Sequence, residues 1–155
     1  MIKTLNLRKL IPSLLIPIFT GLLAQIFSSN AKEVYSALKR PPLSPPSIVF
    51  PFVWTAIYIL LGIALYFVEE SKCYKNTPRK IFAVLLVLNV LWPLFFFTLN
   101  WYTFSVFIIV LLLISAIATF VAFYNCEKAA GYFVLPLIIW VIYATYLNIG
   151  TAILN

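Results

Sequence analysis

The chain has 155 residues, of which 64% are hydrophobic and 10% carry a charge. Soluble proteins contain about 45–50% apolar and about 25% charged residues, so this composition excludes a soluble globular domain. The formal net charge of +7 would indicate a nucleic-acid partner in a soluble chain, but the basic residues are scattered over several segments and favour a membrane-topology signal instead.

Four long windows of the sequence carry no charged side chain. A helix needs about 20 apolar residues to cross the hydrocarbon core of a bilayer, and every window meets that length. The third window has 46 residues, which as one helix would be about 69 Å long, more than twice the thickness of the core. It must therefore fold back, and the polar break at residues 100–103 is the natural hairpin. The windows are residues 10–31, 41–68, 81–126 and 129–155.

These windows predict an all-α, integral membrane bundle of five transmembrane helices that forms a single domain over residues 1–155. Prolines within or beside the helices should face protein or a cavity, where neighbouring groups can satisfy the backbone carbonyls that proline leaves unpaired. The helices are expected at about residues 9–28, 48–68, 80–99, 103–124 and 131–153, and the prolines are Pro12, Pro17, Pro51, Pro93 and Pro136.

The first apolar segment has a second interpretation. Basic residues precede it, and Ser29-Asn30-Ala31 has the small-x-small form of a signal-peptide cleavage site. The apolar stretch is longer than the usual 7–15-residue core of a signal peptide, which favours a retained helix over a cleaved one.

The longest connection, called loop 1 here, covers about residues 29–47 and contains four prolines within six positions. Because proline fixes φ, the segment should follow a stiff polyproline-type path. One interpretation is a rigid spacer. The other is a preordered lid carrying Tyr35 and Leu38, which can close a pocket without a large ordering cost. The prolines are Pro41, Pro42, Pro45 and Pro46.

Positive residues are concentrated on the side of the membrane that holds the N-terminus and the second and fourth loops. That side carries eight Lys or Arg residues, against three on the opposite side. The positive-inside rule therefore predicts a cytoplasmic N-terminus and a C-terminus outside. The eight are Lys3, Arg8, Lys9, Lys72, Lys75, Arg79, Lys80 and Lys128, and the three are Lys32, Lys39 and Arg40.

Cys73 and Cys126 both fall at the predicted cytoplasmic surface. Thiols stay reduced in that compartment. We interpret the two cysteines as bystanders rather than as a disulfide or a metal-binding pair.

Missing residue types narrow the chemistry further. The sequence contains no His and no Asp, and its four Glu residues fall in loops or at helix ends. A Ser-His-Asp triad, a His-ligated zinc or haem iron and an intramembrane carboxylate relay are therefore excluded. We expect no metal site, no cofactor and no conventional catalytic residues.

Aromatic and amide residues recur on single faces of three predicted helices. A cavity lined by such rings with a few amide groups suits a flat hydrophobic ligand. The alternative is that the aromatic side chains anchor the helices at the membrane interface and that the Asn side chains hold neighbouring helices together. For Trp54 this anchor interpretation is well supported. Asn89 and Asn148 should point inward in either case. The three sets are Trp54 and Tyr58, Asn89 and Trp92, and Trp140, Ala144 and Asn148.

Small residues form a stripe on the predicted fourth helix. This pattern lets helices approach closely, either inside the bundle or across a homodimer face. The stripe consists of Ser115, Ala118, Thr119 and Ala122.

The order of these motifs resembles the translocator protein / tryptophan-rich sensory protein family, also called peripheral-type benzodiazepine receptors. The resemblance covers nearly the whole chain. The matching segments are residues 35–47 (YSALKRPPLSPPS), 50–58 (FPFVWTAIY) leading to 62–64 (GIA), 88–97 (LNVLWPLFFF) and 136–148 (PLIIWVIYATYLN).

The resemblance implies a membrane receptor whose first loop caps a pocket for porphyrins such as protoporphyrin IX and for benzodiazepine-site ligands, with a role in tetrapyrrole transport or homeostasis. The alternative that it implies is a light-dependent enzyme that degrades protoporphyrin, in which Trp54 and Trp140 would act. The pocket positions that it implies are Tyr35, Pro41, Pro42, Trp54, Tyr58, Asn89, Trp92, Phe95, Trp140 and Ala144.

One departure from the family concerns sterols. The sterol pattern expected on the last helix needs a basic residue after the tyrosine, and none follows Tyr143 or Tyr146, which argues against cholesterol binding. Because no long targeting segment precedes the first helix, we expect a bacterial plasma membrane, with the outer mitochondrial membrane as the alternative.

Overall fold

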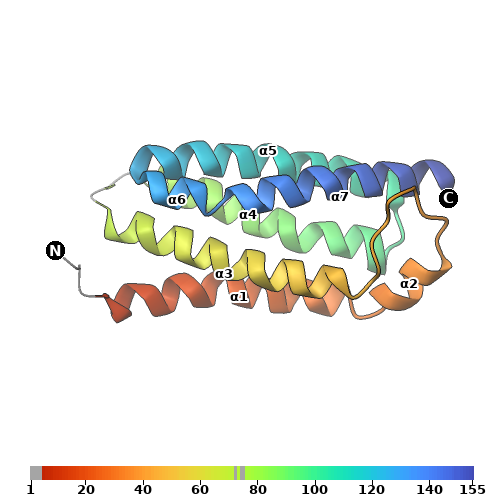
Figure 1. The fold of residues 1–155 in the computed structure, drawn as a ribbon, viewed down its shortest axis with the longest axis horizontal. Helices are drawn as coiled ribbons and strands as arrows, with labels where there is room; N and C mark the ends of the chain where they lie inside the picture. The colour runs from red at the N-terminus through yellow and green to blue at the C-terminus, as the bar shows by residue number, and fades with distance from the viewer. Residues whose placement is uncertain (1–4, 72, 74–75) are drawn as a thin grey trace.

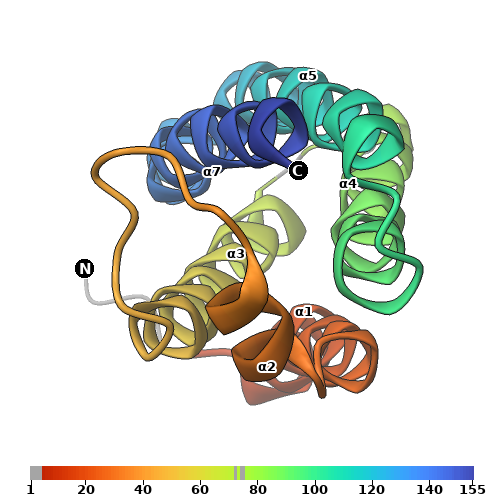
Figure 2. The same ribbon diagram turned by 90° about the vertical axis from the view of Figure 1, so that its right-hand side faces the viewer.

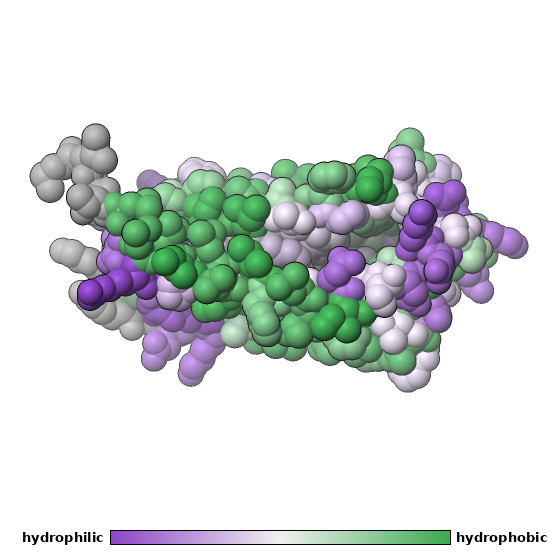
Figure 3. Space-filling model, turned by 90° about the horizontal axis from the view of Figure 1, so that it is seen from below, coloured by the Kyte–Doolittle hydropathy of each residue, from purple (hydrophilic) through white to green (hydrophobic). Residues whose placement is uncertain are grey.

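The computed structural model describes residues 5–71, 73 and 76–155. Within this part of the chain, five helices are long and apolar enough to cross a membrane and no strand occurs, which confirms the predicted all-α membrane bundle (Figure 1). Figure 3 shows a broad apolar band between two polar ends of the molecule. The spanning helices are α1 (Leu7–Phe27), α3 (Val49–Glu70), α4 (Thr77–Pro93) with the π-helix η1 (Leu94–Thr98), α5 (Tyr102–Cys126), and α6 (Lys128–Tyr132) with α7 (Leu135–Leu154).

The predicted hairpin in the longest window is present. Residues 99–101 separate η1 from α5, and Asn100 has a φ of 56°. Asn tolerates this left-handed conformation better than most residues, so it suits the turn. The break begins one residue before the predicted one.

The last spanning segment is two helices rather than one. The chain turns at Phe133 and Val134, and Pro136 lies in the first turn of α7 instead of inside a helix. Proline is favoured there because the first turn needs no backbone donor.

Loop 1 differs from the expected path in two ways. Residues 31–37 form a short helix, α2 (Ala31–Ala37), and a turn at Pro42 and Leu43, with φ 63° at Leu43, interrupts the proline-rich segment. The prediction of one continuous polyproline path is therefore wrong. Figure 2 shows the segment arching from α2 to the end of α7 and back to the start of α3.

The spanning helices form a ring in which α1 packs against α3 and α4, and α5 packs against α4, α6 and α7 (Figure 2). A Cβ added to Gly62 would lie 2.8 Å from Leu14 Cα and 3.0 Å from the Ser13 carbonyl oxygen. Pro17 has no N–H to bond that carbonyl, so Gly62 lets α3 approach α1 where the helix is missing a hydrogen bond.

The half of the bundle near the N-terminus is filled by side chains. The rings of Phe82 and Phe123 lie 5.2 Å apart between α4 and α5. Branched and small residues of α3, α4 and α5 belong to the same core cluster and have no exposure, which leaves this half solid. Residues with no exposure here include Leu61, Ala64, Val68, Leu85 and Leu112.

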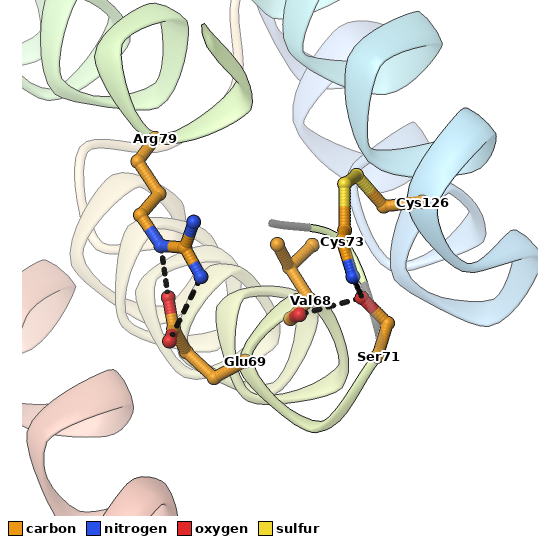
Figure 4. The surroundings of a disulfide bond; sticks show 6 residues. All are labelled: Val68, Glu69, Ser71, Cys73, Arg79 and Cys126. Atoms are coloured by element: carbon orange, nitrogen blue, oxygen red, sulfur yellow. Dashed lines mark hydrogen bonds and ion pairs between the residues drawn. A yellow bond between two sulfur atoms is a disulfide. The ribbon is translucent and has the colours of Figure 1, made fainter. Parts of the chain in front are cut away.

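Cys73 and Cys126 form a disulfide, so the prediction that they are unpaired bystanders is wrong (Figure 4). Their Cα atoms are 5.4 Å apart, within the usual range for a disulfide. The physical reason is topological: the α3–α4 and α5–α6 connections return to the same end of the bundle, as five spans require.

Charges gather at the same end. Arg79 pairs with Glu69 at 2.6 Å (Figure 4), and Lys9 pairs with Glu70 at 3.0 Å. Three of the eight basic residues expected on this side, Lys3, Lys72 and Lys75, lie outside the described residues.

The small-residue stripe of α5 is partly used inside the bundle. Ser115 and Thr119 are buried, and each hydroxyl donates to a carbonyl of its own helix. These two residues therefore support the interpretation of tight internal packing, and only Ala118 and Ala122 remain half-buried.

Candidate ligand-binding site

A cavity of about 530 Å³ lies in the half of the bundle that carries α2. Its walls come from the C-terminal half of α1, from α2, from the N-terminal half of α3, from the C-terminal half of α4 and from η1. The volume falls within the range of about 300–1,000 Å³ found for small-molecule sites. We call this space the main cavity.

Aromatic rings form the inner wall of the main cavity. Trp54 stacks on Tyr58 with ring centroids 5.8 Å apart and lies 6.3 Å from Trp92. Tyr58 fits against α1 because Gly21 has no side chain; a Cβ there would lie 2.7 Å from the tyrosine ring. The three rings offer a flat ligand faces on which to stack.

Asn89 supplies a polar group in the buried part of this wall. Its side chain is 2% exposed, and Nδ2 donates to the Leu85 carbonyl of its own helix at 2.9 Å. Among the described residues, Oδ1 has no hydrogen-bond donor. A buried acceptor without a partner is costly, so a ligand N–H or O–H would be favoured here.

The π-helix changes which phenylalanine reaches the main cavity. On a regular α-helix Phe95 would follow Trp92 on the same face, but in η1 the turn is wider and Phe97 takes that place. Its ring lies 5.9 Å from Trp92. The predicted pocket residue Phe95 packs instead against Phe104 and Trp101, at 4.6 and 5.8 Å.

A second, small cavity of about 20 Å³ lies between the main cavity and α7. Ala144 and Asn148 line it, while Tyr35, Phe50, Trp92 and Phe97 line both spaces and so form the partition.

Asn148 fixes one ring of that partition. It is 1% exposed, its Oδ1 accepts from Trp92 Nε1 at 2.8 Å, and its Nδ2 donates to Ser105 Oγ at 2.9 Å. The expected inward orientation of Asn148 is present, and its amide holds Trp92 in position.

Trp140 lies behind the partition. Its ring is 5.7 Å from Phe50 and 5.6 Å from Tyr143, and it lines neither cavity. Trp54 and Trp140 therefore do not share one cavity surface. Within the described part of the chain, the buried Nε1 of Trp140 has no acceptor.

The loop 1 residues divide between the cavity and α7. Tyr35 lines the main cavity, and its hydroxyl donates to the Pro45 carbonyl at 2.6 Å. Pro41 packs against Gly150 of α7, and the Pro42 carbonyl accepts from the Tyr146 hydroxyl at 2.8 Å. The two prolines therefore dock the loop and do not touch the main cavity.

Of the residues expected in the pocket, Tyr35, Trp54, Tyr58, Asn89 and Trp92 meet in the main cavity. Sequence reasoning missed Phe50, Phe97 and Gly21. The sequence shows three consecutive Phe residues shortly after Pro93, but it does not predict the π-helix that brings the third of them, Phe97, to the cavity. No group of three His, Cys, Asp or Glu residues that could hold a metal ion occurs among the described residues.

The sequence matches the model of the TspO/MBR family over residues 13–154. It is similar to a tryptophan-rich protein TspO of Archaeoglobus fulgidus, with 31% identity over 153 residues that cover 97% of this chain and 99% of the relative. A tryptophan-rich protein TspO of Chlorobaculum tepidum is 36% identical over 128 residues, which cover 81% of both chains. A tryptophan-rich sensory protein of Cereibacter sphaeroides is 30% identical over 123 residues, which cover 79% and 77%.

Proposed function

Because the chain belongs to the TspO/MBR family of membrane sensors and receptors, we propose that it is a receptor for porphyrins such as protoporphyrin IX and for benzodiazepine-site ligands. The ligand binds in the main cavity, and binding serves tetrapyrrole transport or homeostasis. The observation that carries the proposal is an aromatic cavity of about 530 Å³ whose buried wall holds an amide oxygen without a partner among the described residues.

Each part of this wall has a role in the proposal. Trp54, Tyr58 and Trp92 stack on the macrocycle, since offset and edge contacts between rings add about 0.5–1.5 kcal/mol beyond burial. Asn89 Oδ1 accepts from a pyrrole or amide N–H. Tyr35 closes the site from loop 1.

The residues on α7 act behind this wall. Asn148 holds Trp92, Trp140 packs against Phe50, and Ala144 lines the small cavity that Phe50 also lines. A ligand larger than the main cavity would also occupy the small cavity if the Phe50 side chain rotated away. Pro41 and Pro42 keep loop 1 docked.

A light-dependent enzyme is the second candidate. An indole on the cavity wall can donate an electron to an excited porphyrin, and Trp54 stands in that wall with Tyr58 and Trp92 beside it. Trp140 lies one ring further back, behind Phe50, and would donate from outside the cavity wall.

We further propose a bacterial plasma membrane location, a cytoplasmic N-terminus, and a dimer in which the half-buried Ala118 and Ala122 take part. The orientation rests on the excess of basic residues at the end with the N-terminus. It puts the disulfide on the reducing side of the membrane, where disulfides are usually transient.

The test is a titration of the purified protein with metal-free protoporphyrin IX, followed by the porphyrin absorption band. Trp54→Ala should weaken binding at least about tenfold, because a stacking surface and its burial are lost. The matched control is Trp101→Ala, which removes an indole that is 56% exposed at the α4–α5 turn. Equal affinity in the two variants would remove the main cavity from the proposal.

Illumination of the complex separates the two candidates. Trp54→Phe keeps a ring in the wall and should retain most of the affinity. Loss of light-dependent porphyrin consumption in this variant, with binding kept, would favour the enzyme; consumption that is absent from the wild type would favour the receptor.

A further inference from the structure

One charged side chain lines the main cavity among the described residues, and it is Lys32 in the first turn of α2. The residue is exposed, as are Gln25 and Ser29, which also line the cavity. Three other lining residues are buried instead, and they are Tyr58, Asn89 and Trp92. The main cavity is therefore amphipathic, with a polar rim that holds one cation and an apolar aromatic interior.

Lys32 forms no ion pair with any described residue. The ion pairs of the described chain, between Lys9 and Glu70 and between Arg79 and Glu69, lie at the opposite end of the bundle. The acidic side chain nearest in sequence, Glu33, does not line the cavity. An ammonium group at the edge of a low-dielectric space attracts an anion more strongly than one in bulk water, and no described acidic side chain lines the cavity to supply that anion.

The two neighbouring cations, Lys39 and Arg40, do not line the main cavity. The guanidinium of Arg40 lies 4.9 Å above the ring of Tyr35, in a cation–π contact, and Lys39 is outside the lining, with both of its backbone groups bonded to Asn155. The rim therefore presents a single ammonium group. Phosphate sites generally combine several donors or an Arg fork, whereas one ammonium with nearby hydroxyl and amide groups suits a carboxylate.

We propose that the main cavity selects ligands that carry a carboxylate, with Lys32 Nζ bonding the carboxylate at the rim while the apolar body lies against the aromatic wall. The inference rests on the proposed function and adds a specificity to it: among porphyrin ligands of this cavity, acids bind more tightly than their neutral esters. Gln25 and Ser29 flank the carboxylate and can donate to its second oxygen. A lysine at this depth also suits the membrane interface without any ligand, and that alternative predicts no effect on ligand selection.

The experiment compares protoporphyrin IX with its dimethyl ester, which keeps the macrocycle and removes both charges. Each compound is titrated into the wild type, Lys32→Gln, Lys32→Arg and the control Lys39→Gln, at low and at high salt. For the acid, Lys32→Gln should raise Kd about tenfold, Lys32→Arg should restore most of the affinity, and Lys39→Gln should have no effect. For the ester, all four proteins should bind alike, and the difference between acid and ester should shrink at high salt.

Two results would overturn the assignment while leaving the porphyrin site intact: acid and ester binding the wild type equally, or Lys32→Gln weakening both compounds by the same factor. A wild type that binds neither compound would instead overturn the porphyrin receptor itself. Since Lys32 is exposed and has no partner among the described residues, its substitution should leave folding unchanged, and an unchanged melting temperature checks this.

Discussion

The two ends of the helix bundle are built on different principles (Figure 1). The end with α2 holds the main cavity and carries loop 1, which is fastened to α7 by the Tyr146 hydroxyl that donates to the Pro42 carbonyl. The opposite end has a solid core around Phe82 and Phe123, two ion pairs and a disulfide.

This difference assigns stability to one end of the bundle and ligand binding to the other. In a bilayer, transmembrane helices gain little from the hydrophobic effect when they pack together, so close packing and specific bonds decide where a bundle is tight. The solid end supplies those contacts, which lets the other end stay hollow and accept a ligand. Substitutions at the solid end should therefore change unfolding, and substitutions at the hollow end should change binding.

Removal of the disulfide should give the largest effect on stability. Cys73 and Cys126 are 53 positions apart, and a crosslink over such a loop typically contributes about 2–4 kcal/mol. Cys126→Ser should lower the melting temperature in detergent, as should reductant added to the wild type. Ligand affinity should stay within a factor of two of the wild type, because the cavity is at the other end.

Reductant added to Cys126→Ser is the control, and it should have no further effect. A melting temperature that is equal in wild type and variant under oxidising conditions would mean that the solid end does not depend on the crosslink.

Gly62→Ala should give the next largest loss, about 1–3 kcal/mol, because the new Cβ would lie 2.8 Å from the backbone of Leu14 and force α1 away from α3. The matched variant is Gly21→Ala, whose Cβ would lie closest to the ring of Tyr58, a side chain that can move into the cavity. Thermal unfolding should respond mainly to Gly62→Ala and porphyrin affinity mainly to Gly21→Ala. The reverse pattern would contradict the division of labour between the two ends.

Gly150→Ala tests whether loop 1 acts as a lid at the hollow end. A Cβ there would lie 2.6 Å from Pro41 Cβ, so loop 1 would have to lift from α7. At a cost of about 1 kcal/mol, ligand dissociation should become about fivefold faster, with little change in melting temperature. The control is Ile153→Ala, because Ile153 is 78% exposed and lies at the same end of α7. An off-rate equal to that of the control would make loop 1 a spacer, the other interpretation of its prolines.

The helix count followed from the sequence because charge-free length is a direct consequence of bilayer thickness. The same logic put Asn89 and Asn148 inside, since amides are costly in lipid. The features that sequence reasoning missed depend on local backbone geometry: the short helix α2, the turn at Leu43 and the π-helix that brings Phe97 rather than Phe95 to the cavity.

The disulfide was missed for a different reason. The five-helix topology already put Cys73 and Cys126 on one side of the membrane, but the charge bias assigned that side to a reducing compartment, where thiols are expected to stay unpaired. Two cysteines in loops that share one membrane face were the signal that could have found the pair.

The smallest expected effect concerns the ion pair of Arg79 with Glu69 at the solid end. Both side chains are partly exposed, at 36% and 29%, and pairs of this kind contribute about 0.2–1 kcal/mol. Arg79→Gln should therefore lower the melting temperature only slightly, less than Cys126→Ser, and the difference should vanish at high salt, where exposed charges are screened. Porphyrin affinity should not change. The guanidinium donates to both carboxylate oxygens of Glu69. A loss of stability as large as that from the missing disulfide would mean that this pair holds α3 and α4 together more strongly than a partly exposed ion pair is expected to.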